Sequence, residues 1–219
     1  HYIPSCGLHL LVVTACAYLI ACDKHSSGAD NEDSAPSAST ASKANNNSPG
    51  SQRNRWKIES AKIEFVYTGV FEGKETFHLD DWGDTVVIAT DRKEFGNQVH
   101  QTSIWNNNQT TIYKHNDKKA WLGKMRVRDT EPPSSARLTD AQLQSVGYER
   151  MPDEEIAGKK CAVYDNKNLK VKIWMWNGIE LKTINHSLGD GYTKEAVSVI
   201  PGLKVPESAL ALPDGYQFE

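Results

Sequence analysis

Alternation of apolar and polar residues is the feature that most constrains the fold of this chain. In the segment Lys62–Val70, the side chains of Ile63, Phe65 and Tyr67 alternate with those of Glu64, Val66 and Thr68. A period of two is typical of a strand with one buried face. Similar segments follow, and they read KETFHLDDWGD, TVVIAT, VHQTSIW, QTTIYKH, KKCAVYD, LKVKIWMW, IELKTINH and YTKEAVSVI. Because Gly, Asn and Asp separate them, they predict an antiparallel meander.

Two segments between these strands predict short helices. In DKKAWLGKM (117–125), Trp121 and Met125 are one helical turn apart. In LTDAQLQSVGY (138–148), Thr139 is a good N-cap, Gln142 completes a capping box, and Gly147 suits the helix end. Strands, helices and strands in this order predict an α+β domain. We expect a curved antiparallel sheet that forms an incomplete β-barrel, with short helices covering one face or mouth.

An apolar run at Leu8–Ala21 predicts a secretory signal. It is shorter than the ~20 residues that a bilayer-spanning helix needs, but it has the length of a signal h-region. We expect a basic n-region ahead of His1. One possible cleavage site is Ala15-Cys16-Ala17, which fits ordinary signal peptidase.

The second possible cleavage site is Leu19-Ile20-Ala21-Cys22, which resembles the bacterial lipobox. In that pattern a diacylglyceryl group joins the cysteine thiol, and cleavage occurs just before the cysteine. The lipobox accounts together for the end of the apolar run, the small Ala21 and the cysteine. We therefore interpret 1–21 as a lipoprotein signal peptide and Cys22 as the lipid attachment site.

A polar tract separates Cys22 from the rest of the chain. Ser26–Ser51 has no large apolar residue, so it cannot offset the entropy of ordering. We interpret 22–55 as the lipidated cysteine and a flexible tether, and 56–219 as one domain. The net charge of -3 makes no electrostatic case for nucleic acid. Lipobox cleavage leaves Cys161 alone, and we expect it to be a buried small hydrophobe, whereas the other cut would leave Cys22 as a possible partner.

Motifs that name a reaction are absent from the sequence. It contains no G-x-S-x-G, H-E-x-x-H, C-x-x-C or phosphate loop, so we expect no enzyme and no cofactor. His78 and Asp80 share a strand face near Asp81 and Asp84, but no further ligand has motif spacing to them, so we expect no metal. The three histidines expected on polar strand faces are His100, His115 and His186.

The second half of the chain carries a family resemblance. Its motifs are Gly158-Lys159, Cys161, Trp174-x-Trp176-x-Gly178 and Leu181-Lys182, followed by VPESALALPDGYQF. This pattern resembles uncharacterised bacterial envelope lipoproteins with a LolA/LolB/LppX-like fold. The resemblance implies a half-barrel over 56–219 around an apolar cavity with short helices as a lid. LolA and LolB hold lipoprotein acyl chains in that cavity, and LppX-like members hold other lipids.

Tryptophans are the candidates for contact with a hydrophobic ligand. They are Trp105, Trp121, Trp174 and Trp176. Trp174 and Trp176 share one strand face, and Val171, Ile173 and Met175 share the other. The tryptophan face could form a cavity wall, or both faces could be covered core.

Two functions follow as expectations. The first is a membrane-anchored lipoprotein that binds a lipid or other hydrophobic ligand in its half-barrel. The alternative is a non-enzymatic module with a filled barrel that contacts an envelope protein partner. Either would lie in the bacterial cell envelope, anchored to the inner or outer membrane, with the domain facing the periplasm. A cavity of several hundred Å3 would favour the first, and a packed interior the second.

Overall fold

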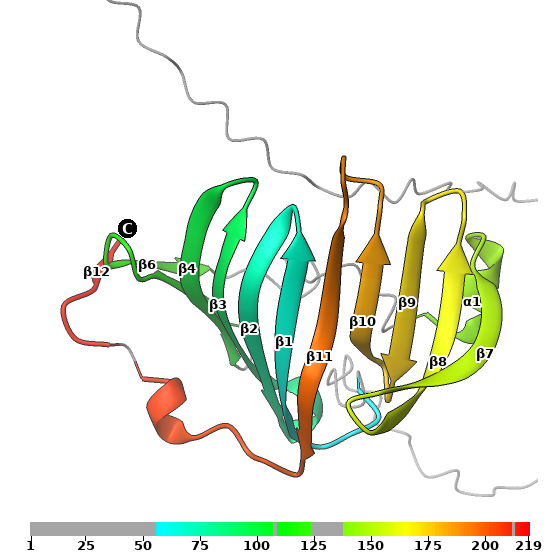
Figure 1. The fold of residues 1–219 in the computed structure, drawn as a ribbon. Coiled ribbons are helices and arrows are strands. Elements are labelled where there is room, and N and C mark those ends of the chain that lie inside the picture. The colour runs from blue at the N-terminus through cyan, green and yellow to red at the C-terminus, as the bar shows by residue number, and fades with distance from the viewer. Residues whose placement is uncertain (1–55, 107–108, 124–137, 212) are drawn as a thin grey trace, which may run out of the picture. The chain divides into compact units, whose positions relative to one another are not determined.

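Strands dominate the structure, which is a computed structural model that describes residues 56–106, 109–123, 138–211 and 213–219. Twelve strands of these residues form one sheet with the order β12-β6-β5-β4-β3-β2-β1-β11-β10-β9-β8-β7 (Figure 1). The strands are β1 (Ala61–Gly69), β2 (Phe71–Asp80), β3 (Thr85–Glu94), β4 (Asn97–Asn106), β5 (Gln109–Lys114), β6 (Lys119–Gly123), β7 (Glu149–Ile156), β8 (Lys159–Asn166), β9 (Val171–Trp176), β10 (Ile179–Asn185), β11 (Tyr192–Pro201) and β12 (Gln217–Phe218). The helical elements are η1 (Asp81–Gly83), α1 (Asp140–Ser145) and η3 (Glu207–Ala209). The predicted signal peptide, Cys22 and the tether lie outside the described residues.

The register of the sheet confirms the predicted alternation. Ile63 of β1 lies opposite Phe77 of β2, and Phe77 lies opposite Ile88 of β3. Ile63 and Phe77 belong to the largest apolar cluster, which also contains Trp105 and Trp174. Because side chains alternate along a strand, this cluster lies on one face of β1–β4, and the opposite face carries polar side chains together with a smaller apolar cluster on β3 and β4.

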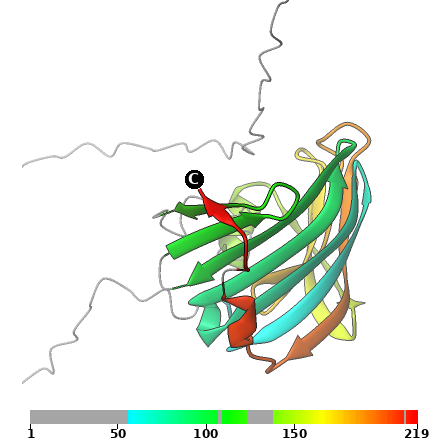
Figure 2. The same cartoon turned by 90° about the vertical axis from the view of Figure 1, so that its left-hand side faces the viewer.

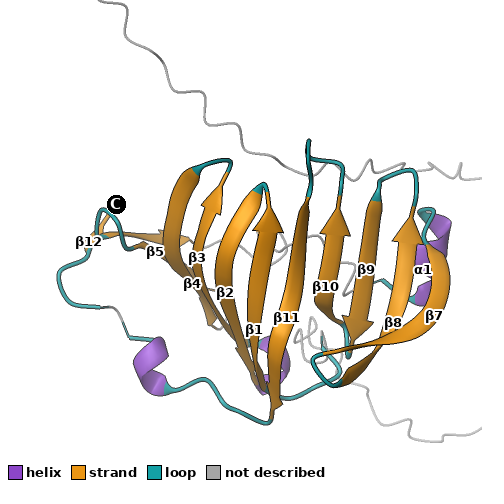
Figure 3. Ribbon diagram, in the orientation of Figure 1, coloured by secondary structure: helices purple, strands orange, loops and turns teal. Residues whose placement is uncertain are grey.

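The sheet is curved and open, as Figure 3 shows. β12 and β7 are its two edges, so the sheet does not close into a barrel. Pairing shifts by one residue between Glu64 and Phe65 where β1 meets β11, and again at Glu180–Lys182 where β10 meets β9. Such bulges bend and twist a strand. The predicted curved sheet is confirmed, whereas a set of short covering helices is not.

The helix predicted over 117–125 is wrong. Residues Lys119–Gly123 form β6, which pairs with β5 so that Trp121 lies opposite Ile112. The ammonium of Lys114 lies 4.7 Å from the centre of the Trp121 ring. Backbone pairing with β5 overrides the helical spacing of two side chains, and Met125 lies outside the described residues.

The C-terminal segment lies across the face of the sheet opposite the largest cluster. Figure 2 shows η3 and β12 in front of the green strands. Val205, Leu210 and Tyr216 pack against the buried residues Val87, Ile104, Tyr113 and Ala120. β12 then pairs in parallel with β6, which places the end of the chain at this edge of the sheet. No helix within the described ranges is long and apolar enough to cross a membrane.

Candidate functional site

The short helix α1 forms where the sequence predicts it. The Thr139 hydroxyl accepts a hydrogen bond from the Gln142 backbone, and the Gln142 side chain accepts one from the Thr139 backbone. This capping box satisfies two backbone donors at the start of a helix of only six residues. The helix ends at Ser145 with Val146 as its C-cap, and Gly147, which follows the cap, has a φ of +90°. The prediction of a capped helix here is confirmed.

One buried leucine attaches α1 to the sheet. Leu143 is 2% exposed and packs against Tyr164 of β8 and Ile173 of β9. At the helix end, the Asn166 amide donates to the Val146 carbonyl at 2.9 Å. These contacts place α1 on the Ile173 and Met175 face of β9, opposite the Trp174 face.

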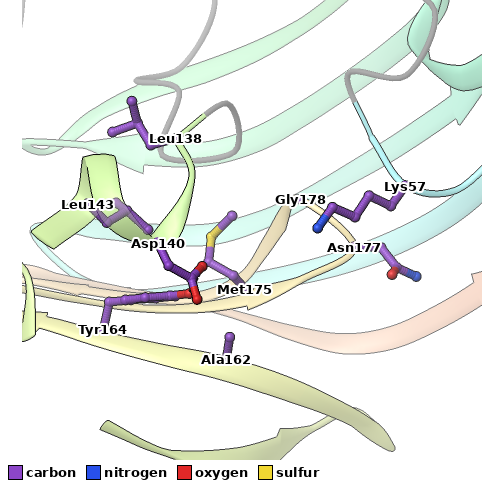
Figure 4. Close-up of a pocket in the computed structure, with 9 residues that line it drawn as sticks. All are labelled: Lys57, Leu138, Asp140, Leu143, Ala162, Tyr164, Met175, Asn177 and Gly178. Carbon is purple, nitrogen blue, oxygen red and sulfur yellow. Dashed lines mark hydrogen bonds between the residues drawn. The ribbon is translucent and has the colours of Figure 1, made fainter. Parts of the chain in front are cut away.

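A cavity of about 200 Å3 lies beside α1, and Figure 4 shows its lining. Apolar groups make up much of the wall, and they come from α1, the residue before its cap, β8 and β9. The lining residues are Lys57, Leu138, Asp140, Leu143, Ala162, Tyr164, Met175, Asn177 and Gly178. The apolar members come from segments that are distant in sequence, so the cavity exists only in the folded chain.

Polar groups lie at two sides of this cavity. The Tyr164 hydroxyl donates a 2.6 Å hydrogen bond to the Asp140 carboxylate. Burial, together with this negatively charged acceptor, raises the pKa of Tyr164 to about 12. Across the cavity in Figure 4 lies the exposed side chain of Lys57, whose backbone N–H donates to the Asn177 carbonyl at 2.9 Å. The cavity wall therefore combines apolar side chains with a carboxylate, a phenol hydroxyl and an ammonium group.

The four tryptophans proposed as ligand contacts do not line this cavity. Trp105 and Trp174 are 8% and 2% exposed, and Trp176 packs against the same large cluster. Trp121 lies apart from that cluster, on β6. Trp174 donates its indole N–H to a carboxylate oxygen of Glu154 at 2.8 Å. Of the residues that line the cavity, Gly178 belongs to a motif of the family resemblance, and Asp140 and Leu143 lie in the predicted capped helix, but none was predicted to contact a ligand. The alternation of Ala162 with Tyr164 and of Ile173 with Met175 could have marked the face that the cavity shares.

A second polar cluster lies on the face of the sheet that carries the largest apolar cluster. Glu75 is 7% exposed and accepts hydrogen bonds from Tyr67, Arg92 and Lys194 at 3.0, 2.9 and 2.6 Å. Burial alone would raise the pKa of Glu75, but the cations Lys194 and Arg92 outweigh it and lower that pKa. Burial raises the pKa of Tyr67 to about 12. Because these groups bind one another, we interpret the cluster as a structural link between strands.

Metal and thiol chemistry receive little support from the described residues. Within these ranges, no group of three or more His, Cys, Asp or Glu side chains could hold a metal ion. The Cys161 side chain is buried, as the sequence predicted, and burial raises its pKa to about 11. A thiol with a raised pKa is a poor nucleophile at neutral pH.

Comparisons with known proteins concern the fold. No family model matches the sequence, and no curated protein matches it. An uncharacterized conserved protein from Thermus thermophilus is 6% identical, with a TM-score of 0.50 over 74% of this chain and 90% of that chain. MucB is 15% identical, with a TM-score of 0.44 over 74% of this chain and 60% of that chain. The Pseudomonas aeruginosa MucA/MucB complex gives 15% identity and a TM-score of 0.42, over 74% of this chain and 58% of that one. At 6% identity, the likeness to the Thermus protein is one of fold alone.

Proposed function

We propose that this protein is a lipid-anchored, non-enzymatic protein of the bacterial envelope that binds an apolar group in the cavity beside α1. The observation that carries the proposal is the cavity of about 200 Å3 with Leu138, Leu143, Ala162 and Met175 on its walls. Removing apolar surface from water stabilises a complex by about 25 cal/mol per Å2. The lipobox-like segment ending at Cys22 supports the anchor and the envelope location.

The size of the cavity limits what it can hold. Pockets that enclose a drug-sized ligand measure roughly 300–1,000 Å3, and this cavity is smaller. We therefore propose that it takes one short apolar group, such as the end of an acyl chain, rather than a complete lipid. Lys57 and Asp140 at its margins suit an amphiphile whose polar end remains near water.

A second candidate is the interaction module, and the packing of the sheet favours it. Trp105 and Trp174 fill the largest apolar cluster rather than lining the cavity. A cavity of this size would also accept one large apolar side chain of an envelope protein partner. The two candidates share the cavity and differ only in what supplies the apolar group.

Substitutions in the cavity test the proposal. Ala162→Leu adds bulk to the cavity wall, and Ala89→Leu makes the same change at an exposed position on β3. We expect the wild-type protein and A89L to bind a fluorescent fatty acid, and A162L to bind it at least tenfold more weakly. Equal binding by A162L and wild type would refute the cavity as the site.

Failure of all three proteins to bind the fatty acid would remove the lipid candidate. Crosslinking of the full protein in cells would then test the interaction module. In that case A162L should lose a crosslinked partner that A89L keeps. Thermal unfolding of both variants would show that each remains folded.

A further inference from the structure

Two rows of side chains cross β2, β3 and β4 on the face of the sheet opposite Glu75. In the first row, the pairing places Lys74 opposite Asp91 and Asp91 opposite His100. In the second row it places Thr76 opposite Ala89 and Ala89 opposite Thr102. Directly paired side chains point to the same face, so the two rows lie side by side.

The small side chain of Ala89 leaves a hollow between larger neighbours. A pocket of about 210 Å3 is lined by both rows, together with residues adjacent to them on the same strands. Ala89 is exposed at its floor. The next row contains Val87 and Ile104, which pack with Val205 and Leu210 of the C-terminal segment. The hollow is therefore bounded on that side by a covered apolar surface.

Two histidines in contact with each other lie at the β4 end of the hollow. The rings of His100 and His115 lie 4.5 Å apart. The Thr102 hydroxyl is 2.9 Å from Nε2 of His115, and Nδ1 of His115 contacts the Tyr216 hydroxyl. Thr102 and His100 therefore both contact His115, which in turn contacts Tyr216 of the C-terminal segment.

Several polar groups in the hollow have unused hydrogen-bonding capacity. The structure gives no side-chain hydrogen bond or ion pair between the Lys74 ammonium, or the Thr76 hydroxyl, and any residue in the described ranges. One oxygen of Asp91 accepts from the Gln98 amide at 2.7 Å, and carboxylate oxygens have capacity for further donors. The hollow combines an ammonium donor, a carboxylate acceptor and two hydroxyls that can do both.

The charges of the hollow indicate the class of ligand. An anion would meet the carboxylate of Asp91 at the centre of its row, and a cation would meet the ammonium of Lys74. A neutral ligand with several hydroxyls avoids both repulsions, and each hydroxyl can donate to Asp91 while accepting from Lys74 or a threonine. We propose that this hollow is a binding site for a neutral carbohydrate. The site is separate from the cavity beside α1 and does not depend on its function.

Amide chemical shifts of the 15N-labelled protein test this site with defined sugars. The probes are cellobiose and maltose as neutral sugars, glucose 6-phosphate as an anion and glucosamine as a cation. We expect a neutral sugar to shift the amide signals of Ala89 and Thr102 with a dissociation constant of about 1 mM. The charged sugars should bind at least tenfold more weakly, because each meets one repulsive group.

Matched substitutions locate the binding. Ala89→Leu fills the floor of the hollow and should weaken binding of the neutral sugar at least tenfold. Ala89→Ser keeps the floor small and should bind as the wild type does, and Ala162→Leu, in the other cavity, should also leave sugar binding unchanged. The proposal is overturned if no neutral sugar shifts these signals at tens of millimolar concentration, if only a charged sugar does, or if A89L binds as tightly as A89S.

Discussion

The ammonium of Lys194 lies 2.6 Å from a carboxylate oxygen of Glu75, although the two residues are 119 positions apart. Strand β1 lies between their strands and contributes the hydroxyl of Tyr67 to the other oxygen of the same carboxylate. Arg92 of β3 also donates to that second oxygen. One carboxylate therefore links β1, β2, β3 and β11 within a largely apolar face.

Removing this carboxylate should destabilise the fold. Glu75→Gln leaves the largely buried ammonium of Lys194 without its counter-charge, and it leaves Arg92 paired with Glu94 alone. Breaking a buried ion pair in this way costs about 3–5 kcal/mol of unfolding free energy. Urea unfolding measures the change, and the exposed Glu72→Gln on the same strand should change it by less than about 0.5 kcal/mol. Equal urea midpoints for E75Q and E72Q would contradict the structural role.

The same carboxylate should make stability depend on acidic pH. Glu75 has a lowered pKa in the fold, and its ordinary unfolded value is about 4.3. The contribution of Glu75 to folding stability is therefore complete above its unfolded pKa, and it is lost as pH falls through the lower pKa of the folded state. Urea unfolding can be measured from about pH 7 to about pH 3. The difference in unfolding free energy between wild type and E75Q should be constant above about pH 5 and should become smaller below about pH 4. A gap that does not narrow would show that the charge of Glu75 is not responsible.

A histidine should make docking of the C-terminal segment depend on pH as well. Burial, and then the neighbouring His100, lowers the pKa of His115, which contacts Tyr216. The docked segment thus favours neutral His115, so docking is strongest above the ordinary histidine value of about 6.5 and weakens as pH falls below it. Lys119 and Glu219 form an ion pair at the same edge, and neither a lysine nor a glutamate normally titrates between about pH 7.5 and about pH 5.5.

Hydrogen exchange of residues 213–219 measures this docking. After correction for the intrinsic effect of pH on exchange, protection should be lower at about pH 5.5 than at about pH 7.5. His115→Phe should remove this pH dependence, whereas His186→Phe, in the turn after β10, should keep it. A pH dependence that persists in H115F would assign the effect to another group.

The attachment of α1 should depend on one side chain. Leu143→Ala removes the buried contact with Tyr164 and Ile173, and Leu→Ala changes in a core cost about 2–5 kcal/mol. The control is Leu169→Ala, at an exposed leucine in the β8–β9 turn. The difference between the melting temperatures of the two variants measures what burial of Leu143 contributes to stability. We expect L143A also to weaken fatty-acid binding, because it removes part of the cavity wall. An unchanged melting temperature for L143A would contradict this packing.

Lipid attachment can be tested directly by mass. We expect the protein produced in bacteria behind a lipoprotein signal to carry a diacylglyceryl adduct at Cys22. Cys22→Ser should lack the adduct and should be released from membranes. Cys16→Ser should keep the adduct and stay attached to membranes. An unmodified Cys22 in the mature wild-type protein would favour cleavage after Ala17.

Local patterns in the sequence predicted much of the fold. The alternation of Ile63, Phe65 and Tyr67 predicted a strand with one buried face because strand periodicity depends only on neighbouring residues. Thr139 and Gln142 predicted the start of α1 for the same reason, since a capping box closes within one turn. The spacing of Trp121 and Met125 predicted a helix that is absent. Pairing with β5, which is not a local property, made that segment a strand.

The candidate sites could not be predicted in the same way. The tryptophan motif predicted a ligand site on the face of β9 that in fact packs into the largest cluster. The cavity lies on the other face, beside Met175, because Leu143 brings α1 there. Likewise, nothing local indicates that Lys74, Ala89 and His100 line one hollow, because strand register sets their neighbours.

The sequence by itself determined the strand periodicity, the helix cap and the lipobox-like segment, because each depends on residues a few positions apart. Only the tertiary structure decided the pairing of Lys194 with Glu75, the cavity beside α1 and the hollow over Ala89. These features join residues that are far apart along the chain. Sheet register, bulges and the packing of α1 place them in contact, and no single stretch of sequence encodes that arrangement.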